Sequence, residues 1–214
     1  MIVRVLGEEI PYARWLLRIL RDRSSNVESF RWALRRAGWL LALEASEELE
    51  WSNVEVETPL GYSVRELELQ RPPLVVEILG AGLPLAEGVL DVYPNAPIAL
   101  VAARRIEEGR DLRVEITYER LPANWEGAAF IVDPMLATGM TISKVVEVLD
   151  RINVVKVIVL SVIAAPEGVK TLFKAKSDAV LYTLAIDKGL NDKYFIVPGL
   201  GDAGDRGLGV KPRD

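Results

Sequence analysis

Apolar and polar residues along the N-terminal part of the chain follow two different periods. Apolar positions recur at helical spacing over residues 12–21 and again over residues 30–44, where Ser29 is the expected N-cap. Residues 54–69 instead alternate between apolar and charged side chains, which indicates strands or a hairpin. The chain is therefore expected to open with a helical segment that leads into β-structure.

From residue 74 onward, short apolar runs bounded by turn residues predict the strands of a buried sheet. Helices are expected between these runs, at residues 85–90 and 142–149. Strands that alternate with helices are typical of an α/β fold with a mostly parallel central sheet flanked by helices. The strands are expected at residues 74–79, 98–102, 130–132, 154–163, 179–184 and 194–197.

The whole chain, residues 1–214, is predicted to form a single domain, because half of its residues are apolar and no linker interrupts the pattern. Residues 104–126 depart from the pattern, since they are polar and rich in charges. We interpret this segment as a flexible hairpin or flap attached to the sheet.

The composition excludes several kinds of chemistry. The chain has no cysteine and no histidine, so disulfides, thiolate catalysis and Ser-His triads are ruled out. The net charge of −5 argues against a nucleic-acid partner, which would favour a basic surface. No apolar run is long enough to span a membrane and no signal peptide is recognisable, so we expect a cytoplasmic protein without a membrane partner.

A first candidate site follows the apolar run that ends at Val132. A carboxylate at the end of this strand is followed by a short loop and by the first turn of a helix, where free N–H groups and the helix dipole favour a phosphate. Such a segment either binds a phosphate or merely shapes a turn between strand and helix. Its residues are Asp133, Pro134, Met135, Leu136, Ala137, Thr138, Gly139, Met140 and Thr141.

A second candidate site is the glycine-rich stretch at residues 195–206. Its residues from Pro198 to Arg206 read Pro-Gly-Leu-Gly-Asp-Ala-Gly-Asp-Arg, which is unsuited to the interior of a helix or a strand. The stretch is either a plain surface loop or a place where the backbone approaches a ligand closely.

The two strings together resemble the uracil phosphoribosyltransferases, a family of the type I phosphoribosyltransferases. Asp-Pro-Met-Leu-Ala-Thr-Gly at residues 133–139 resembles the loop that binds phosphoribosyl pyrophosphate (PRPP), and residues 195–206 resemble the base-binding loop. The resemblance implies transfer of the phosphoribosyl group of PRPP to uracil, which gives UMP and pyrophosphate.

The resemblance also implies a role for individual residues. Asp133, Asp202 and Arg105 would be catalytic. Arg105, Gly80 and Asp202 would join residues 133–141 in binding PRPP. The uracil contacts would be Ile196, Gly201, Asp202 and Ala203. Mg²⁺ is expected to bind mainly through PRPP, without a metal site held by the protein, because Mg²⁺ keeps waters and needs few protein ligands.

One position departs from the family. The family usually reads Ile-Leu-Arg-Ala-Gly-Leu where residues 78–83 read Ile-Leu-Gly-Ala-Gly-Leu, so Gly80 replaces a cation that would face pyrophosphate. An alternative hypothesis is therefore a regulator that binds a nucleotide or PRPP and whose catalysis is weakened. The family further implies a homodimer or homotetramer, with GTP or CTP as effectors.

Overall fold

A computed structural model describes residues 1–108 and 111–210, except for the side chains at positions 105, 107, 108, 111 and 112. The central sheet has eight strands in the order β1-β10-β9-β7-β4-β5-β6, with β8 paired to β9 beside this path. All neighbours are parallel except β5 and β6. The strands are β1 (Ile2–Val5), β4 (Leu74–Ile78), β5 (Ile98–Glu108), β6 (Asp111–Arg120), β7 (Ala128–Val132), β8 (Met135–Leu136), β9 (Lys156–Ala164) and β10 (Val180–Ile186).

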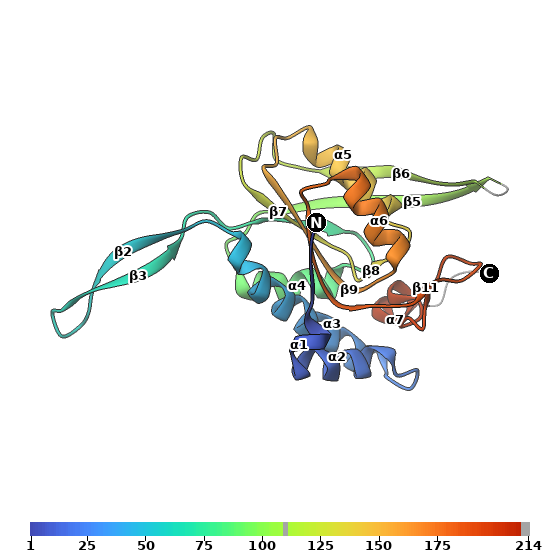
Figure 1. Cartoon of the computed structure of the whole chain (residues 1–214), viewed down its shortest axis with the longest axis horizontal. Coiled ribbons are helices and arrows are strands. Elements are labelled where there is room, and N and C mark those ends of the chain that lie inside the picture. The colour runs from blue at the N-terminus through green and yellow to red at the C-terminus, as the bar shows by residue number, and fades with distance from the viewer. Residues whose placement is uncertain (109–110, 211–214) are drawn as a thin grey trace.

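Helices cover both faces of the sheet, so the predicted α/β class is confirmed (Figure 1). One apolar core joins α2, α3 and α4 to the sheet, and a second core joins α5 and α6 to its other face. No described helix is long and apolar enough to cross a membrane. The helices are α1 (Leu6–Glu9), α2 (Pro11–Arg21), α3 (Val27–Glu44), the 3-10 helix η1 (Ala45–Glu48), α4 (Leu83–Val92), α5 (Met140–Asp150), α6 (Pro166–Ala175) and α7 (Ala203–Leu208).

Two details of the predicted elements were wrong. The N-cap of α3 is Asn26, whose side chain accepts a hydrogen bond from the Ser29 N–H at 2.8 Å, so the helix begins before the serine. Residues 194–197 do not form a strand of the central sheet. Tyr194 has a positive φ of 60°, and only β12 (Ile196–Val197) is extended, paired with β11 (Gly189–Leu190). The pattern also failed to reveal β1, α6 and α7.

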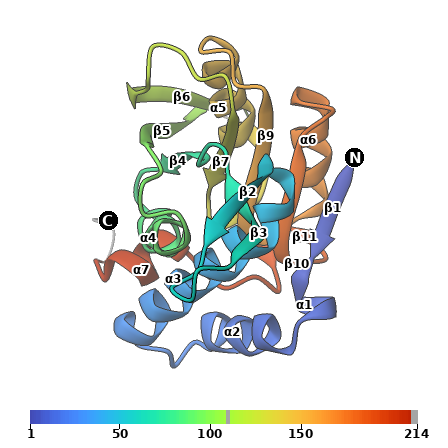
Figure 2. The same cartoon turned by 90° about the vertical axis from the view of Figure 1, so that its left-hand side faces the viewer.

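Two hairpins extend from opposite sides of the molecule (Figure 1). Strands β5 (residues 98–108) and β6 (residues 111–120) form a long hairpin that overlaps residues 104–126, where the sequence predicted a hairpin or flap. Strands β2 (Trp51–Glu57) and β3 (Ser63–Leu69) form a separate two-stranded sheet that projects away from the core. Figure 2 views the molecule from the side of this projecting hairpin.

An acidic residue is buried in the sheet. Glu77 on β4 is 6% exposed, and its Oε1 atom has no hydrogen-bond partner among the described residues. Burial raises the pKa of this carboxyl above its ordinary value of 4.5, and the nearby Glu87 raises it further. Ionisation of Glu77 therefore opposes folding.

We expect the substitution Glu77→Gln to stabilise the protein at neutral pH by about 1 to 3 kcal/mol, because the neutral amide avoids the cost of burying an ionised carboxylate. A carboxyl with a raised folded pKa favours folding below its unfolded pKa, and this benefit is lost as pH rises through the folded pKa. The gain should accordingly vanish near pH 4 and grow toward pH 8 in urea unfolding curves. Glu8→Gln, at an exposed carboxyl of α1, is the control. A gain that does not change with pH would contradict the expectation.

Candidate active site

Loops that are distant in the sequence meet at one edge of the sheet. Strands β4, β7, β9 and β10 run parallel, so the loops that follow them lie at their shared carboxyl edge, where ligands of open α/β sheets bind. In Figure 1 this is the side of α7, β11 and the tip of the β5–β6 hairpin. A Cβ built on Gly204 would lie 4.0 Å from the Cβ of Ala81, so the C-terminal loop touches the loop after β4.

The first half of the loop after β7 is held by the sheet. The Pro134 carbonyl accepts hydrogen bonds from the N–H groups of Val162 and Ile163, at 3.0 and 3.1 Å. The Leu136 N–H donates to the Ser161 hydroxyl at 3.2 Å, and Leu136 is buried. Pro134 and Leu136 therefore frame the loop, and their backbone groups are already used within the protein.

The second half of the loop presents the N-terminus of α5. Gly139 is the N-cap residue with a positive φ of 77°, and it has no side chain with which to cap the helix. A Cβ on Gly139 would lie 2.8 Å from the Gly168 carbonyl oxygen, so no larger residue fits. A small pocket is lined by residues of this loop, including Asp133, Thr138 and Thr141. A helix N-terminus with adjacent hydroxyl groups is suited to a phosphate.

Asp133 stands at the start of this loop, directly after β7. Its Oδ1 atom accepts a hydrogen bond from the Met135 N–H at 3.3 Å, which folds the loop back over the strand end. The neighbouring Thr138 hydroxyl accepts from the Met140 N–H at 3.3 Å. These contacts keep the carboxylate in the lining of this small pocket.

The glycine-rich loop at residues 195–206 is a tight sequence of turns that ends in α7. Gly199 and Gly201 have positive φ angles of 67° and 79°. A Cβ on Gly199 would lie 2.2 Å from the Ile196 carbonyl oxygen, so only glycine fits there. The Asp202 side chain caps α7 by accepting from the Asp205 N–H at 2.9 Å, and Ala203 is buried beside it.

Arg206 holds this loop against α2 and the turn that follows α2. The sequence did not predict this structural role. Its guanidinium donates to the carbonyl oxygens of Leu20, Asp22 and Leu200, and it lies 4.2 Å from the Phe30 ring centre. Burial lowers the pKa of this arginine. The only signal in the sequence was the arginine at the end of the glycine-rich string.

Gly80, which replaces the arginine usual in the family, has a backbone conformation that favours glycine. Its φ is +110°, a region that residues with a Cβ rarely adopt, although no atom lies within 4 Å of a Cβ built there. The space for a side chain is therefore open, while the backbone as it stands favours glycine. Simply restoring an arginine would strain this turn.

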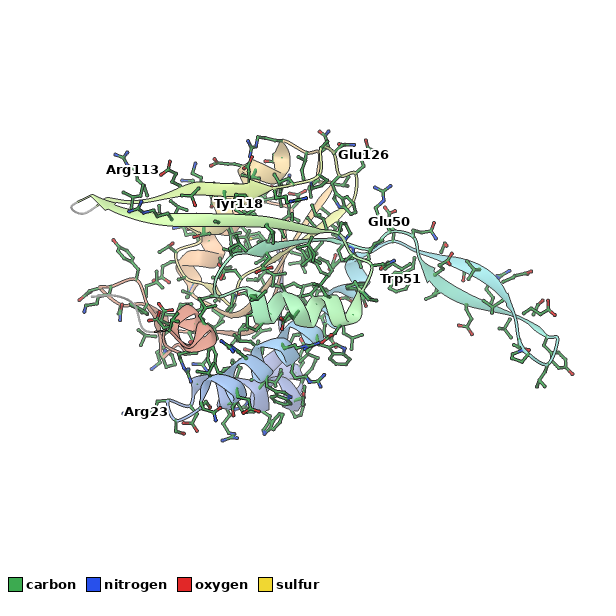
Figure 3. All side chains as sticks on the ribbon, turned by 180° about the vertical axis from the view of Figure 1, so that it is seen from behind. Arg23, Glu50, Trp51, Arg113, Tyr118 and Glu126 are labelled. Atoms are coloured by element: carbon green, nitrogen blue, oxygen red, sulfur yellow. The ribbon has the colours of Figure 1, made fainter. Side chains whose placement is uncertain are left out.

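The structure does not place every predicted site residue. The backbone of Arg105 lies on β5 opposite Val114, but its side chain is outside the described residues. Arg113 and Tyr118 mark the same hairpin on β6 in Figure 3. No group of three or more acidic side chains in the described ranges is placed to hold a metal ion.

Known proteins were compared with this chain first by structure, which concerns the fold, and then by sequence, which concerns the family. A purine phosphoribosyltransferase from Pyrococcus horikoshii shares the fold, with a TM-score of 0.51 and 16% identity over 74% of this chain and 85% of that chain. A protein from Aquifex aeolicus is more similar, with a TM-score of 0.90 and 34% identity over 100% of both chains. The sheet and the loops at its carboxyl edge thus define a fold of the type I phosphoribosyltransferase class.

Sequence relatives narrow this class. The family model "Uracil phosphoribosyltransferase" matches residues 8–209. The uracil phosphoribosyltransferase of Aeropyrum pernix is 49% identical over 98% of both chains, and that of Pyrobaculum arsenaticum is 43% identical over 96% of this chain and 98% of its own. The chain belongs to the uracil phosphoribosyltransferase family.

Proposed function

We propose that this protein transfers the phosphoribosyl group of PRPP to uracil, giving UMP and pyrophosphate. The observation that carries the proposal is the meeting of two unlike loops at one sheet edge. The N-terminus of α5, with its adjacent hydroxyl groups, suits a sugar phosphate, and the glycine-rich loop suits a flat base. Membership in the uracil phosphoribosyltransferase family supports the same reaction.

In the proposed reaction the uracil N1 atom forms a bond to C1 of the ribose while the bond from C1 to pyrophosphate breaks. The electron pair of the broken bond leaves with pyrophosphate, and the N1 proton is released. Positive charge grows on the sugar in the transition state, and the carboxylates of Asp133 and Asp202 would stabilise it. Mg²⁺ bound to PRPP would neutralise charge on the leaving pyrophosphate.

The chain's other residues would orient the reactants. The N–H groups and hydroxyls from Thr138 to Thr141 would hold the 5-phosphate, and Arg105 would contact pyrophosphate. Backbone groups of Ile196, Gly201 and Ala203 would read the uracil edge. Cytosine has an amino group, a donor, where uracil has a carbonyl oxygen, an acceptor. This amino group would face a backbone N–H donor, which leaves both donors unpaired and lowers the rate.

The direct test is to incubate the full chain with PRPP, Mg²⁺ and uracil and to measure UMP by chromatography. We expect UMP formation that depends on all three components. Cytosine, xanthine and guanine compete in the same assay, and we expect uracil to be used preferentially. Binding of PRPP without any UMP would contradict the proposal and favour a catalytically weakened regulator.

We further propose that the protein works as a homodimer or homotetramer. The β2–β3 hairpin supports this, because a lone two-stranded sheet is marginally stable and this one exposes Leu60, Tyr62 and Leu67 by 83%, 70% and 65%. Trp51 and Glu50 mark the root of the hairpin in Figure 3. Light scattering of the purified chain checks the mass, and addition of GTP or CTP to the UMP assay checks the proposed effectors.

A further inference from the structure

An arginine at the end of α2 is bonded to the glycine-rich loop. The Arg21 guanidinium meets the Asp187 carboxylate through two hydrogen bonds, Nη2 to Oδ1 at 2.6 Å and Nη1 to Oδ2 at 3.1 Å. The same Nη1 also donates to the carbonyl oxygen of Gly199 at 3.2 Å. Three donor contacts thus join residues that are more than 160 positions apart.

Asp187 also bonds directly to Gly199, through the N–H group that Arg21 does not contact. It follows β10, at the carboxyl edge of the sheet, and its Oδ2 atom accepts from the Gly199 N–H at 2.9 Å. Its side chain is only 6% exposed and that of Arg21 is 27% exposed. Both polar groups of the Gly199 residue are therefore fixed by one mostly buried ion pair, in the two-pronged geometry that gives arginine its directional precision.

The clamp, formed by Arg21 and Asp187, acts on the segment that faces the base. Next to Gly199, the Leu200 carbonyl oxygen accepts from Arg206 at 2.5 Å, and Asp202 begins α7 as its cap. The short span between these anchors contains Gly201. None of the hydrogen bonds within residues 1–108 and 111–210 uses the Gly201 N–H, so that group is available to a ligand.

We infer that Arg21 and Asp187 are positioning residues that set the orientation of the Gly201 backbone and thereby the affinity and selectivity for the base. This inference rests on the proposed function, because it assumes that residues 199–203 hold uracil. The clamp lies on the Gly199 side of the loop, where its two side chains bond to each other and to the Gly199 backbone. A substitution in the clamp should raise the KM for uracil much more than the KM for PRPP.

The conservative substitution Arg21→Lys tests this directly. Lysine keeps the charge and loses the two-pronged contact and the bond to the Gly199 carbonyl. Loss of one such charge-assisted contact is worth about ten- to a hundredfold. We expect the KM for uracil to rise by about that factor, the KM for PRPP to change less than about threefold, and the preference for uracil over cytosine to fall.

Arg18→Lys is the matched control, since Arg18 lies one turn earlier on the same helix and is exposed. Asp187→Asn and the double variant complete a cycle in which the effects should not add, because both residues act through the same contact. If Arg21→Ala folds, millimolar guanidinium should partly restore its KM for uracil. Thermal melting of each variant reports folding separately.

The outcomes separate the two proposals. An unmodified protein that forms no UMP would reject the proposed function itself. An active protein whose Arg21→Lys variant melts at a lower temperature but keeps its KM for uracil and its base preference would overturn the positioning role alone. Equal rises in the KM values for uracil and PRPP would also overturn it.

Discussion

The substitution Asp133→Asn is expected to lower kcat by about 10²- to 10³-fold, the usual effect of removing one group that stabilises developing charge. The amide retains the acceptor for the Met135 N–H, which is the contact that shapes the loop. It removes the negative charge that the proposed reaction places beside the sugar. KM values for PRPP and uracil should change much less than kcat, because the charge matters mainly in the transition state.

Asp178→Asn is the control for this prediction. Asp178 is exposed in the turn between α6 and β10, at the opposite edge of the sheet, so its charge is remote from the pocket. Steady-state kinetics and thermal melting of both variants decide the matter. A normal kcat in Asp133→Asn, or an equal loss in Asp178→Asn, would show that the carboxylate at the loop is not part of the reaction.

The second prediction compares Gly80→Arg with Gly80→Ala. Both variants place a Cβ on a residue with a φ of +110°, and a strained conformation of this kind costs about 1 to 3 kcal/mol. For a chain of this length that cost lowers the melting temperature by about 2 to 12 °C. The two variants should therefore melt at similar temperatures, below the unmodified protein.

Activity then separates charge from strain. A new arginine beside pyrophosphate should raise kcat/KM for PRPP by about ten- to a hundredfold over the alanine variant, the worth of one charge-assisted contact. The comparison with alanine is essential, because arginine measured against glycine alone would combine a gain with a loss. Identical kcat/KM values for the two variants would mean that position 80 does not need a cation in this protein.

The predictions that rested on strong local patterns were the most accurate ones. The run at residues 74–79 became β4 and the run at residues 154–163 became β9, because continuous apolar segments are stable only when both faces are covered. The boundary residues were less certain. Ser29 and Asn26 can both cap a helix, and only the observed hydrogen bond shows that Asn26 does.

Elements made by long-range contacts were missed. Strand β1 has four residues and is defined by its pairing with β10, nearly 180 positions away, so no local period marks it. Tyr194 looked like part of a strand, yet the turn before β12 requires a positive φ there. Short segments of this kind take their conformation from their neighbours in space.

Residue types and short spacings were sufficient to predict the α/β class, the two candidate loops and the family that these loops indicate. The contacts that hold those loops in place became visible only in the folded chain. Folding joined Arg21, Asp187 and Gly199 into one ion-paired unit, set Arg206 under the loop and gave Gly80 its positive φ. Such contacts depend on which distant backbone groups the folded sheet brings within about 3 Å, the range of a hydrogen bond, and no local pattern encodes that distance.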